Sequence, residues 1–367
     1  MARIRALIVD DSVVVRKVLT DALSNDPSVE VVGTAANGVI ALKKIPQVNP
    51  DIVVLDVEMP EMDGLETVKH IRASWPKLPV IMCSSLTERG AETTLRALAF
   101  GASDYVAKPS RLNANDVDNL AGFKAELLAK VKALCGVEPT ISAALPPRIP
   151  LAAVRPRTQR DAVSVLAIGC STGGPTALST LFEGLPRDLP VPILIVQHMP
   201  PLFTKLLAER LAASSGIKVT EATHGERVEP GSAYVAPGDH HMTVVVDGVH
   251  RRIALNQETP ECSCRPAVDV LFRSLAKVYG AGVLASVMTG MGHDGTRGAR
   301  DIVDAGGTLI VQNAATCVVP SMPQAVVDAG LASGVFPLEQ LAHELVLRVR
   351  RGAVDVGVSP ALARVGA

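Results

Sequence analysis

The sequence predicts an α/β protein with two domains, each built around an open, doubly wound parallel β-sheet. In the first 135 residues, and again from about residue 162, short apolar runs alternate with stretches of helical periodicity. A proline-rich stretch without an apolar period separates the two arrays. Strands that alternate with helices favour parallel sheets covered by helices, and 367 residues suffice for two such cores.

Five buried strands are predicted for the first domain, residues 1–135. They correspond to the apolar runs "IRALIVDD", "VEVVGTAA", "DIVVLDV", "PVIMCSS" and "SDYVAKP". Helical patterns lie between these runs, and the first of them begins after Ser12. A last helix over about residues 121–135 completes the domain.

The second domain, predicted over residues 162–352, repeats this alternation with one interruption. Its apolar runs begin at "AVSVLAIGCS" and continue with "VPILIVQH", "VLASVMTGMGHD" and "GGTLIVQN". Within "AYVAPGDHHMTVVVDGVHRRIAL", Asp247 and Gly248 separate two strand-like runs, which predicts a small antiparallel hairpin insert. Pro266 is expected in the first turn of the next helix. Residues 136–161 are predicted to be an extended linker, and residues 353–367 a C-terminal tail.

Composition and charge exclude several classes of protein. The net charge of −1 argues against a nucleic-acid-binding protein. Asp10 and Asp11 come before any signal-peptide apolar region, and no apolar run approaches the ~18 residues of a membrane span, so we expect a cytoplasmic protein without membrane insertion. Cys262 and Cys264 form a C-x-C with no second half, which predicts no metal site there.

Polar side chains follow four of the predicted strands of the first domain. Asp10 and Asp11 follow the first strand, Asp56 the third, Ser84 the fourth and Lys108 the fifth. Ligands of open parallel sheets bind beyond the carboxyl ends of the strands. Three carboxylates at one point repel each other unless a cation lies between them, and Mg²⁺ prefers such oxygen ligands. The set predicts phosphoryl transfer to Asp56.

Residues 3–134 resemble a response-regulator receiver domain, through these strand-end residues and the Lys108-Pro109 pair. The resemblance implies a flavodoxin-like fold with a five-stranded parallel sheet. It implies that Asp56 accepts the phosphoryl group and that Asp10, Asp11 and Asp56 hold Mg²⁺ during phosphorylation. It also implies switch roles for three side chains: Ser84, Tyr105 and Lys108.

The stretch "IGCSTGGPTA" in the second domain fits the G-x-S-x-G pattern of an exposed nucleophile at Ser171. A phosphate-binding loop would need a following Lys-Ser or Lys-Thr, which this stretch lacks. His198 and Asp294 also follow apolar runs. A nucleophile, a base and an acid therefore lie at the carboxyl ends of strands, and this shared position on one edge of the sheet makes a triad plausible.

The chemistry predicted for this triad is attack of Ser171 on a carbonyl carbon. His198 takes the serine proton, and Asp294 orients and stabilises the imidazole. Free backbone N–H groups are expected near Thr172, where the turn leads into a helix at about Pro175, and near Met291 in "TGMGHDG". They are candidates for an oxyanion hole. Cys170 is a rival nucleophile that we expect to face the core.

The whole chain, residues 3–352, resembles the CheB family of chemotaxis protein-glutamate methylesterases. The motifs "GCSTGGP", "QHMP", "APGDHHM", "CRPAVDVLF" and "TGMGHDG" carry the resemblance. It implies the triad Ser171, His198 and Asp294, an oxyanion contribution from Met291, and no cofactor for the esterase reaction. It implies as substrates the γ-methyl-glutamyl side chains of chemoreceptor cytoplasmic helices, whose selected glutamines the same chemistry would deamidate. The implied phosphodonor is a chemotaxis-type histidine kinase.

We expect the receiver to regulate the esterase by one of two mechanisms. The receiver either blocks the strand edge that carries Ser171 or helps to build that edge. Blocking is the simpler device, because the edge must open to admit a helical protein substrate. A monomer is the simplest oligomeric state. The alternative function is a response regulator whose output domain binds receptors without catalysis or binds DNA.

Overall fold

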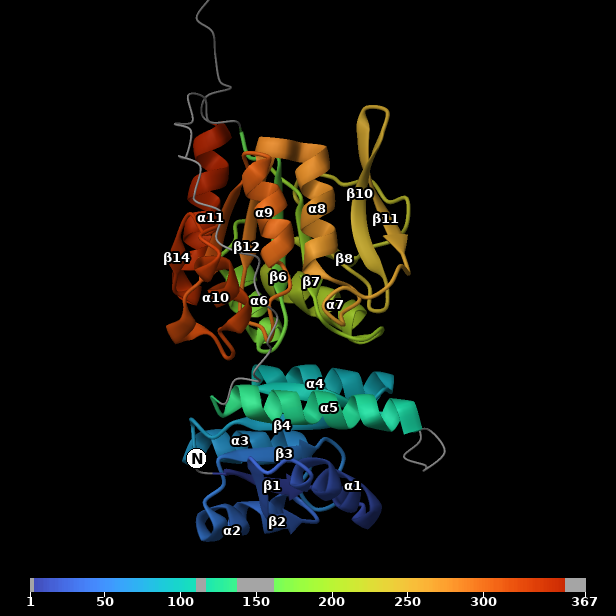
Figure 1. Cartoon of the computed structure of the whole chain (residues 1–367), viewed down its shortest axis with the longest axis vertical. Helices are drawn as coiled ribbons and strands as arrows, with labels where there is room; N and C mark the ends of the chain where they lie inside the picture. The colour runs from blue at the N-terminus through green and yellow to red at the C-terminus, as the bar shows by residue number, and fades with distance from the viewer. Residues whose placement is uncertain (1–2, 110–116, 137–161, 354–367) are drawn as a thin grey trace, which may run out of the picture.

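The computed structural model describes residues 3–109, 117–136 and 162–353. Each of the two sequence arrays forms an α/β domain, and the two domains stack along the long axis of the molecule (Figure 1). Nearly all of the predicted linker and tail lies outside the described residues. None of the described helices is long and apolar enough to span a bilayer.

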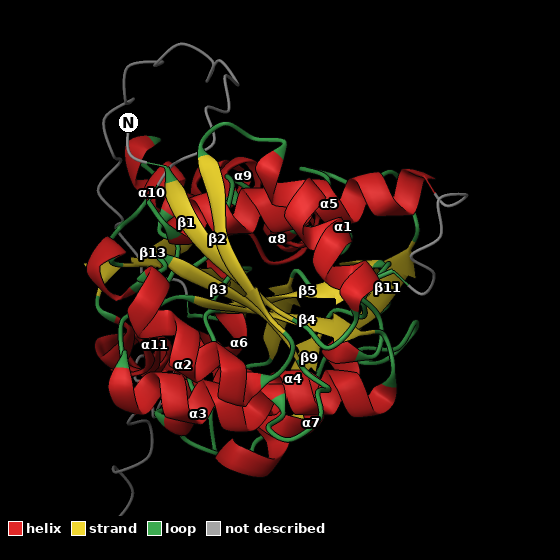
Figure 2. Cartoon of the chain, turned by 90° about the horizontal axis from the view of Figure 1, so that it is seen from below, coloured by secondary structure: helices red, strands yellow, loops and turns green. Residues whose placement is uncertain are grey.

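The first domain contains one five-stranded parallel sheet with the strand order β2-β1-β3-β4-β5. Helices α1 and α5 cover one face, and α2, α3 and α4 cover the other (Figure 2). The strands are β1 Ile4–Val9, β2 Val29–Ala35, β3 Ile52–Asp56, β4 Val80–Ser85 and β5 Asp104–Lys108. The helices are α1 Val13–Ser24, α2 Gly38–Val48, α3 Gly64–Ser74, α4 Glu88–Ala99 and α5 Val117–Leu134.

Side-chain caps fix where the helices of this domain begin. The residues Ser12, Asn37, Asp63 and Thr87 each accept a hydrogen bond from a backbone N–H in the first turn of α1, α2, α3 and α4 respectively. Such caps satisfy N–H groups that have no partner within the helix. The caps follow the strands closely, so the carboxyl ends of the strands face short loops.

The second domain contains a seven-stranded parallel sheet with the order β14-β13-β12-β6-β7-β9-β8. Helices α6, α7 and α11 pack together on one side, and α8, α9 and α10 on the other. The strands are β6 Val165–Cys170, β7 Ile193–Gln197, β8 Lys218–Glu221, β9 Ser232–Val235, β12 Val283–Val287, β13 Thr308–Gln312 and β14 Val335–Phe336. The helices are α6 Gly174–Glu183, α7 Phe203–Ser215, α8 Val268–Tyr279, α9 Thr296–Asp304, α10 Ser321–Asp328 and α11 Leu338–Ala353.

The predicted hairpin consists of β10 (His241–Asp247) and β11 (His250–Asn256), which pair antiparallel and pack against α8. Two details differ from the sequence expectation. The preceding "AYV" belongs to β9 in the parallel sheet, because Ala233 to Val235 pair with β7. Pro266 precedes the first helical residue of α8 by two positions and lies outside its first turn.

Candidate active site

Ser171 and His198 follow neighbouring strands of the second sheet. Ser171 comes directly after β6 and His198 directly after β7, and the last residues of these strands, Cys170 and Gln197, are register partners. The N–H of His198 donates to the Cys170 carbonyl at 3.2 Å. Asp294 lies in the loop between β12, on the other side of β6, and α9. The three residues therefore share one edge of one sheet.

The structure brings His198 and Asp294 into contact, with 2.8 Å between Nε2 and Oδ2. Asp294 is 2% exposed. It also accepts backbone N–H bonds from Val268 at 2.6 Å, Asp269 at 2.9 Å and Gly295 at 2.8 Å. Burial opposes the charge, but the hydrogen bond to His198 and these N–H donors outweigh it and lower the pKa of Asp294. The carboxylate is thus a fixed negative charge that orients the imidazole.

Ser171 is half-buried, and its Oγ has no hydrogen-bond partner among the described residues. Its backbone is held on both sides: its N–H donates to the Thr289 carbonyl at 3.0 Å, and Gln197 Nε2 donates to its carbonyl at 3.0 Å. No hydrogen bond joins Ser171 to His198. The structure therefore joins two members of the predicted triad and sets the third beside them with a free hydroxyl.

Two glycines explain the shape of the turn at Ser171. A Cβ on Gly169 would lie 2.4 Å from Val268 Cγ1, so a side chain there would displace the start of α8. Gly173 has a φ of +76°, which favours glycine. The G-x-S-x-G pattern thus lets α8 approach β6 and lets the chain turn sharply into α6.

Cys264, which the sequence analysis considered only as part of a C-x-C motif, is a neighbour of His198. Its Sγ lies 3.4 Å from His198 Nδ1, so both imidazole nitrogens have partners. Burial disfavours the imidazolium, but the interactions of the ring with Cys264 and Asp294 outweigh burial and raise the pKa of His198 above its ordinary value of 6.5. The only signal in the sequence was "CRPAVDVLF", which does not reveal that Cys264 meets His198.

Backbone N–H groups suitable for an oxyanion hole lie on both sides of Ser171. The N–H groups of Thr172 and Met291 donate to no acceptor in the described part of the chain, whereas those of Gly290 and Gly292 are both engaged. A Cβ on Gly290 would lie 2.9 Å from Ser171 Cβ, which places this loop against the serine. Thr172 and Met291 thus remain the candidates that the sequence predicted.

Cys170 lies in the core, as the sequence analysis expected. It is 0% exposed, and its Sγ contacts the Val196 carbonyl at 3.8 Å. Burial raises the pKa of its thiol well above the ordinary value. A buried, protonated thiol is a poor nucleophile.

The first domain gathers its carboxylates around Lys108. Lys108 Nζ lies 2.7 Å from Asp10 Oδ2 and 2.7 Å from Asp56 Oδ1. Burial, and to a lesser degree the charge of Asp10, raise the pKa of Asp56 to about 6, although Lys108 opposes the shift. Carboxylate oxygens of Asp10, Asp11 and Asp56 lie within 4.8 Å of one another. Such an all-oxygen donor set, partly open to solvent at Asp11, fits Mg²⁺.

Ser84 and Ser85 take different positions at this site. Ser85 lines the hollow above Asp56, together with Asp11 and Lys108. Ser84 is 0% exposed, and its Oγ donates to the Ser85 carbonyl at 3.2 Å. A switch role for Ser84 therefore stays a prediction.

Comparison with known proteins agrees with both halves of this description. Residues 6–115 match the response regulator receiver domain family, and residues 166–345 match the CheB methylesterase family. A protein-glutamate methylesterase/protein-glutamine glutaminase of Trichodesmium erythraeum is 46% identical and covers 95% of this chain and 100% of its own length. A Nocardioides protein of the same name is 48% identical over 96% of this chain and 97% of its own.

The chain belongs to the CheB methylesterase family. The CheB methylesterase catalytic domain of Thermotoga maritima has 41% sequence identity and a TM-score of 0.50, and covers 50% of this chain and 97% of that one. An esterase domain thus follows the receiver, and neither a DNA-binding nor a non-catalytic output is supported.

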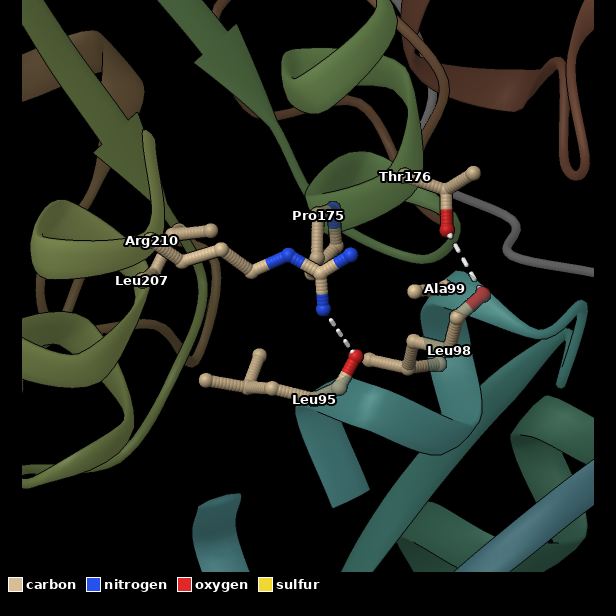
Figure 3. A pocket seen from close by; sticks show the side chains of 7 residues that line it. All are labelled: Leu95, Leu98, Ala99, Pro175, Thr176, Leu207 and Arg210. Atoms are coloured by element: carbon tan, nitrogen blue, oxygen red, sulfur yellow. Dashed lines mark hydrogen bonds between the residues drawn. The ribbon is translucent and has the colours of Figure 1, made fainter. Parts of the chain in front are cut away.

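In this CheB-family chain, the receiver contacts the helices that follow Ser171 and His198. Thr176 Oγ1, in the first turn of α6, donates to the Leu98 carbonyl of α4 at 3.3 Å, and Arg210 of α7 donates through Nη1 to the Leu95 carbonyl (Figure 3). Pro175 lines the same small pocket. α4 therefore rests on the first turn of α6, which begins three residues after the serine.

Tyr105, predicted as a switch residue, lies in this interface. Its ring stacks on Phe203, the first residue of α7, with ring centroids 4.7 Å apart and an interplanar angle of 10°. Tyr105 is 4% exposed, and burial raises the pKa of its hydroxyl well above the ordinary value. The ring is thus part of the contact between the domains, and its movement would disturb that contact.

We expect phosphorylation to require the carboxylates at Lys108. Asp56→Asn removes the acceptor oxygen, so labelling by a radioactive small phosphodonor such as acetyl phosphate should disappear. Asp11→Asn and chelation of divalent cations should strongly reduce labelling, because a ligand or the ion is lost. Asp21→Asn, at an exposed position of α1, is the matched control and should label normally. Label that survives Asp56→Asn would identify another acceptor.

We also expect the pH dependence of kcat/KM to show the influence of Cys264 on the pKa of His198. A general base must be neutral, so kcat/KM falls as the pH drops below the pKa of His198. Since that pKa is raised, the acidic limb should lie above pH 6.5, and Cys264→Ala should move it to lower pH by removing one cause of the shift. Cys135→Ala, in the receiver, should leave the limb in place. A limb unchanged in Cys264→Ala would show that this thiol does not tune His198.

Proposed function

We propose that the chain hydrolyses glutamate γ-methyl esters on chemoreceptor cytoplasmic helices, releasing methanol, and deamidates selected receptor glutamines. The observation that carries this proposal is the His198–Asp294 pair beside the free hydroxyl of Ser171. Methylesterase relatives that match almost the whole chain support it. The esterase reaction would need no cofactor.

Ser171 Oγ is the proposed nucleophile. It attacks the ester carbonyl carbon while His198 takes its proton, and the tetrahedral intermediate then expels methanol, which receives that proton. A glutamyl ester of Ser171 remains, and water activated by His198 hydrolyses it to the free glutamate. Attack on a glutamine amide follows the same steps with ammonia as the leaving group.

His198 Nδ1 is the nitrogen that would accept the serine proton, because Nε2 is engaged with Asp294. In the structure, Nδ1 faces Cys264 instead of Ser171. Hydrogen bonds of catalytic groups often align only when substrate is bound. We therefore propose that substrate binding brings Ser171 Oγ within reach of Nδ1, in competition with the thiol.

The N–H groups of Thr172 and Met291 are the proposed donors to the oxyanion. Each would stabilise charge that develops on the carbonyl oxygen, by about 3 kcal/mol in favourable cases. The first turn of α6 contributes the positive end of its helix dipole on the same side.

Phosphorylation of Asp56 by a chemotaxis-type histidine kinase is proposed to relieve inhibition by the receiver. Asp10, Asp11 and Asp56 would hold Mg²⁺, which supplies positive charge for the incoming phosphoryl group. The phosphoryl group would draw Lys108 and Ser84 toward Asp56, and movement of Tyr105 would weaken its contact with Phe203. Inhibition by blocking is favoured because α4 covers the start of α6, where a receptor helix must approach Ser171. A monomer suffices for this scheme.

Substitution of the serine tests the proposed activity. Ser171→Ala should reduce methanol release from membranes that carry methylated receptors by a factor on the order of 10⁴ or more, because the acyl-enzyme cannot form. The matched thiol variants Cys170→Ala and Cys264→Ala should keep most of the release. If Ser171→Ala stays active while Cys264→Ala is dead, a Cys264–His198–Asp294 triad performs the reaction.

A further inference from the structure

A strained turn beside the active site carries a second thiol, Cys262. The turn closes through a hydrogen bond from the Cys264 N–H to the Glu261 carbonyl at 2.8 Å. Its central residues, Cys262 and Ser263, have φ values of 50° and 61°, in the left-handed region that side chains rarely adopt. Backbone strain of this kind persists at sites where the position of a side chain matters.

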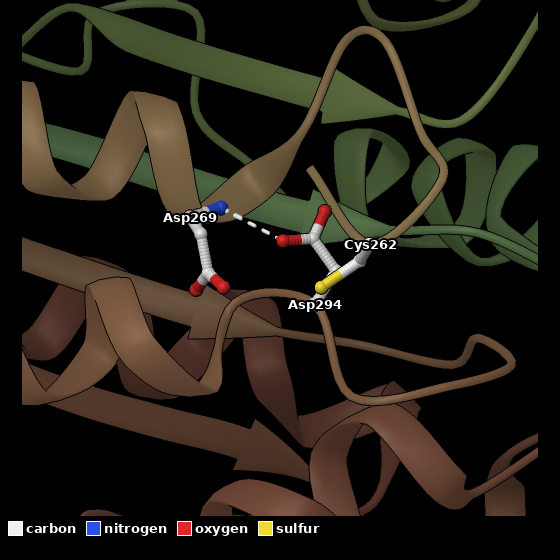
Figure 4. A group of neighbouring side chains, drawn as sticks. All are labelled: Cys262, Asp269 and Asp294. Carbon is white, nitrogen blue, oxygen red and sulfur yellow. Dashed lines mark hydrogen bonds between the residues drawn. The ribbon is translucent and has the colours of Figure 1, made fainter. Parts of the chain in front are cut away.

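Cys262 faces two carboxylates that come from elsewhere in the domain. Donor atoms of Cys262, Asp269 and Asp294 all lie within 4.8 Å of one another, and the three side chains meet between the turn, the start of α8 and the loop before α9 (Figure 4). Cys262 Sγ also lies 3.9 Å from His293 Nε2. The sequence shows no second pair of ligands for the C-x-C motif, but the fold brings Asp269 and Asp294 next to Cys262.

Asp269 supplies an independent sign that this cluster has a ligand. Its side chain is 0% exposed, and Oδ1 accepts the Gly298 N–H at 2.7 Å, but Oδ2 has no hydrogen-bond partner in the described part of the chain. A buried carboxylate oxygen without a partner is costly unless a proton or a cation satisfies it.

We propose that Cys262, Asp269 and Asp294 bind one Zn²⁺ ion. Thiolate and carboxylate are donors that Zn²⁺ takes, with bonds of about 2.0–2.3 Å, so these three donor atoms, which lie within 4.8 Å of one another, need to close in by roughly 1 Å. Binding displaces the thiol proton of Cys262 to solvent and gives Asp269 Oδ2 its missing partner. Cys262 and His293 are half-buried, which leaves a path for the ion.

Zn²⁺ at this site inhibits the esterase, an effect that rests on the proposed function. Asp294 is shared between the cluster and His198. A cation that draws on Asp294 removes negative charge from the imidazole that must act as the base. The site therefore gives a thiophilic metal ion control over a reaction that itself needs no metal.

Metal binding to the full chain tests the site without using activity. With excess Mg²⁺ present to saturate the receiver carboxylates, Co²⁺ should give a sulfur-to-metal charge-transfer absorption at one equivalent, and Zn²⁺ should displace it. Cys262→Ser should abolish the band and weaken Zn²⁺ binding by a factor on the order of 10–100. Asp269→Asn should weaken binding but keep the band. Cys135→Ser and Cys264→Ser should bind as the unchanged chain does.

Three results would overturn the site: no band in the unchanged chain, a band that survives in Cys262→Ser, or a band lost in Cys264→Ser. The last would place the ion on the Cys264–His198 pair instead. For inhibition, Zn²⁺ should stop methanol release by the unchanged chain, a chelator should restore it, and Cys262→Ser should need at least tenfold more Zn²⁺. If the unchanged chain and Cys262→Ser are equally sensitive to Zn²⁺, inhibition through this site is refuted. If the unchanged chain releases no methanol at all, the proposed function is refuted, while the result on metal binding still stands.

Discussion

The contacts that α4 and β5 of the receiver make with α6 and α7 connect the phosphorylation site of this chain to its esterase site. α6 begins three residues after Ser171, and α7 begins five residues after His198, so both helices start where the catalytic edge of the sheet lies. Arg210 and Thr176 bond carbonyl groups of α4, and Tyr105 stacks on Phe203. Because β5 carries both Tyr105 and Lys108, a change in the charge around Lys108 acts three residues from the interdomain stack.

The catalytic edge contains more competing interactions than a triad requires. His198 has a carboxylate on one nitrogen and a thiol on the other, while Ser171 Oγ has no partner among the described residues. Asp294 serves His198, three backbone N–H groups and the cluster with Cys262. The reactivity of this edge therefore depends on which partner each group has, and for this reason we propose that a thiol and a metal ion influence the esterase.

The sequence was sufficient to predict residues that follow the strands of a parallel sheet. It was not sufficient to predict contacts between loops that are far apart in the chain. The positions of Ser171, His198, Asp56 and Lys108 at the edges of the two sheets were predicted because parallel strands end at a common edge. Cys264 beside His198 was missed, because the turn before α8 reaches the edge only through tertiary packing. Further differences have similar causes. β9 pairs with β7 instead of joining the hairpin, and Phe203, the partner of Tyr105, comes from the other domain.

If the contact at α4 restrains the esterase, a substitution at Arg210 should show it most directly. Arg210→Ala removes a cross-domain hydrogen bond without touching Ser171 or Asp56, and Lys205→Ala, at an exposed position of the same helix, is the matched control. Methanol release by the unphosphorylated full chain should rise about five- to thirtyfold, because about 1–2 kcal/mol of coupling free energy between the domains is lost. Phosphorylation should then increase the rate of the variant by a smaller factor than it increases the rate of the unchanged chain. A rate that falls in Arg210→Ala would contradict the account and indicate that the receiver helps to build the catalytic edge.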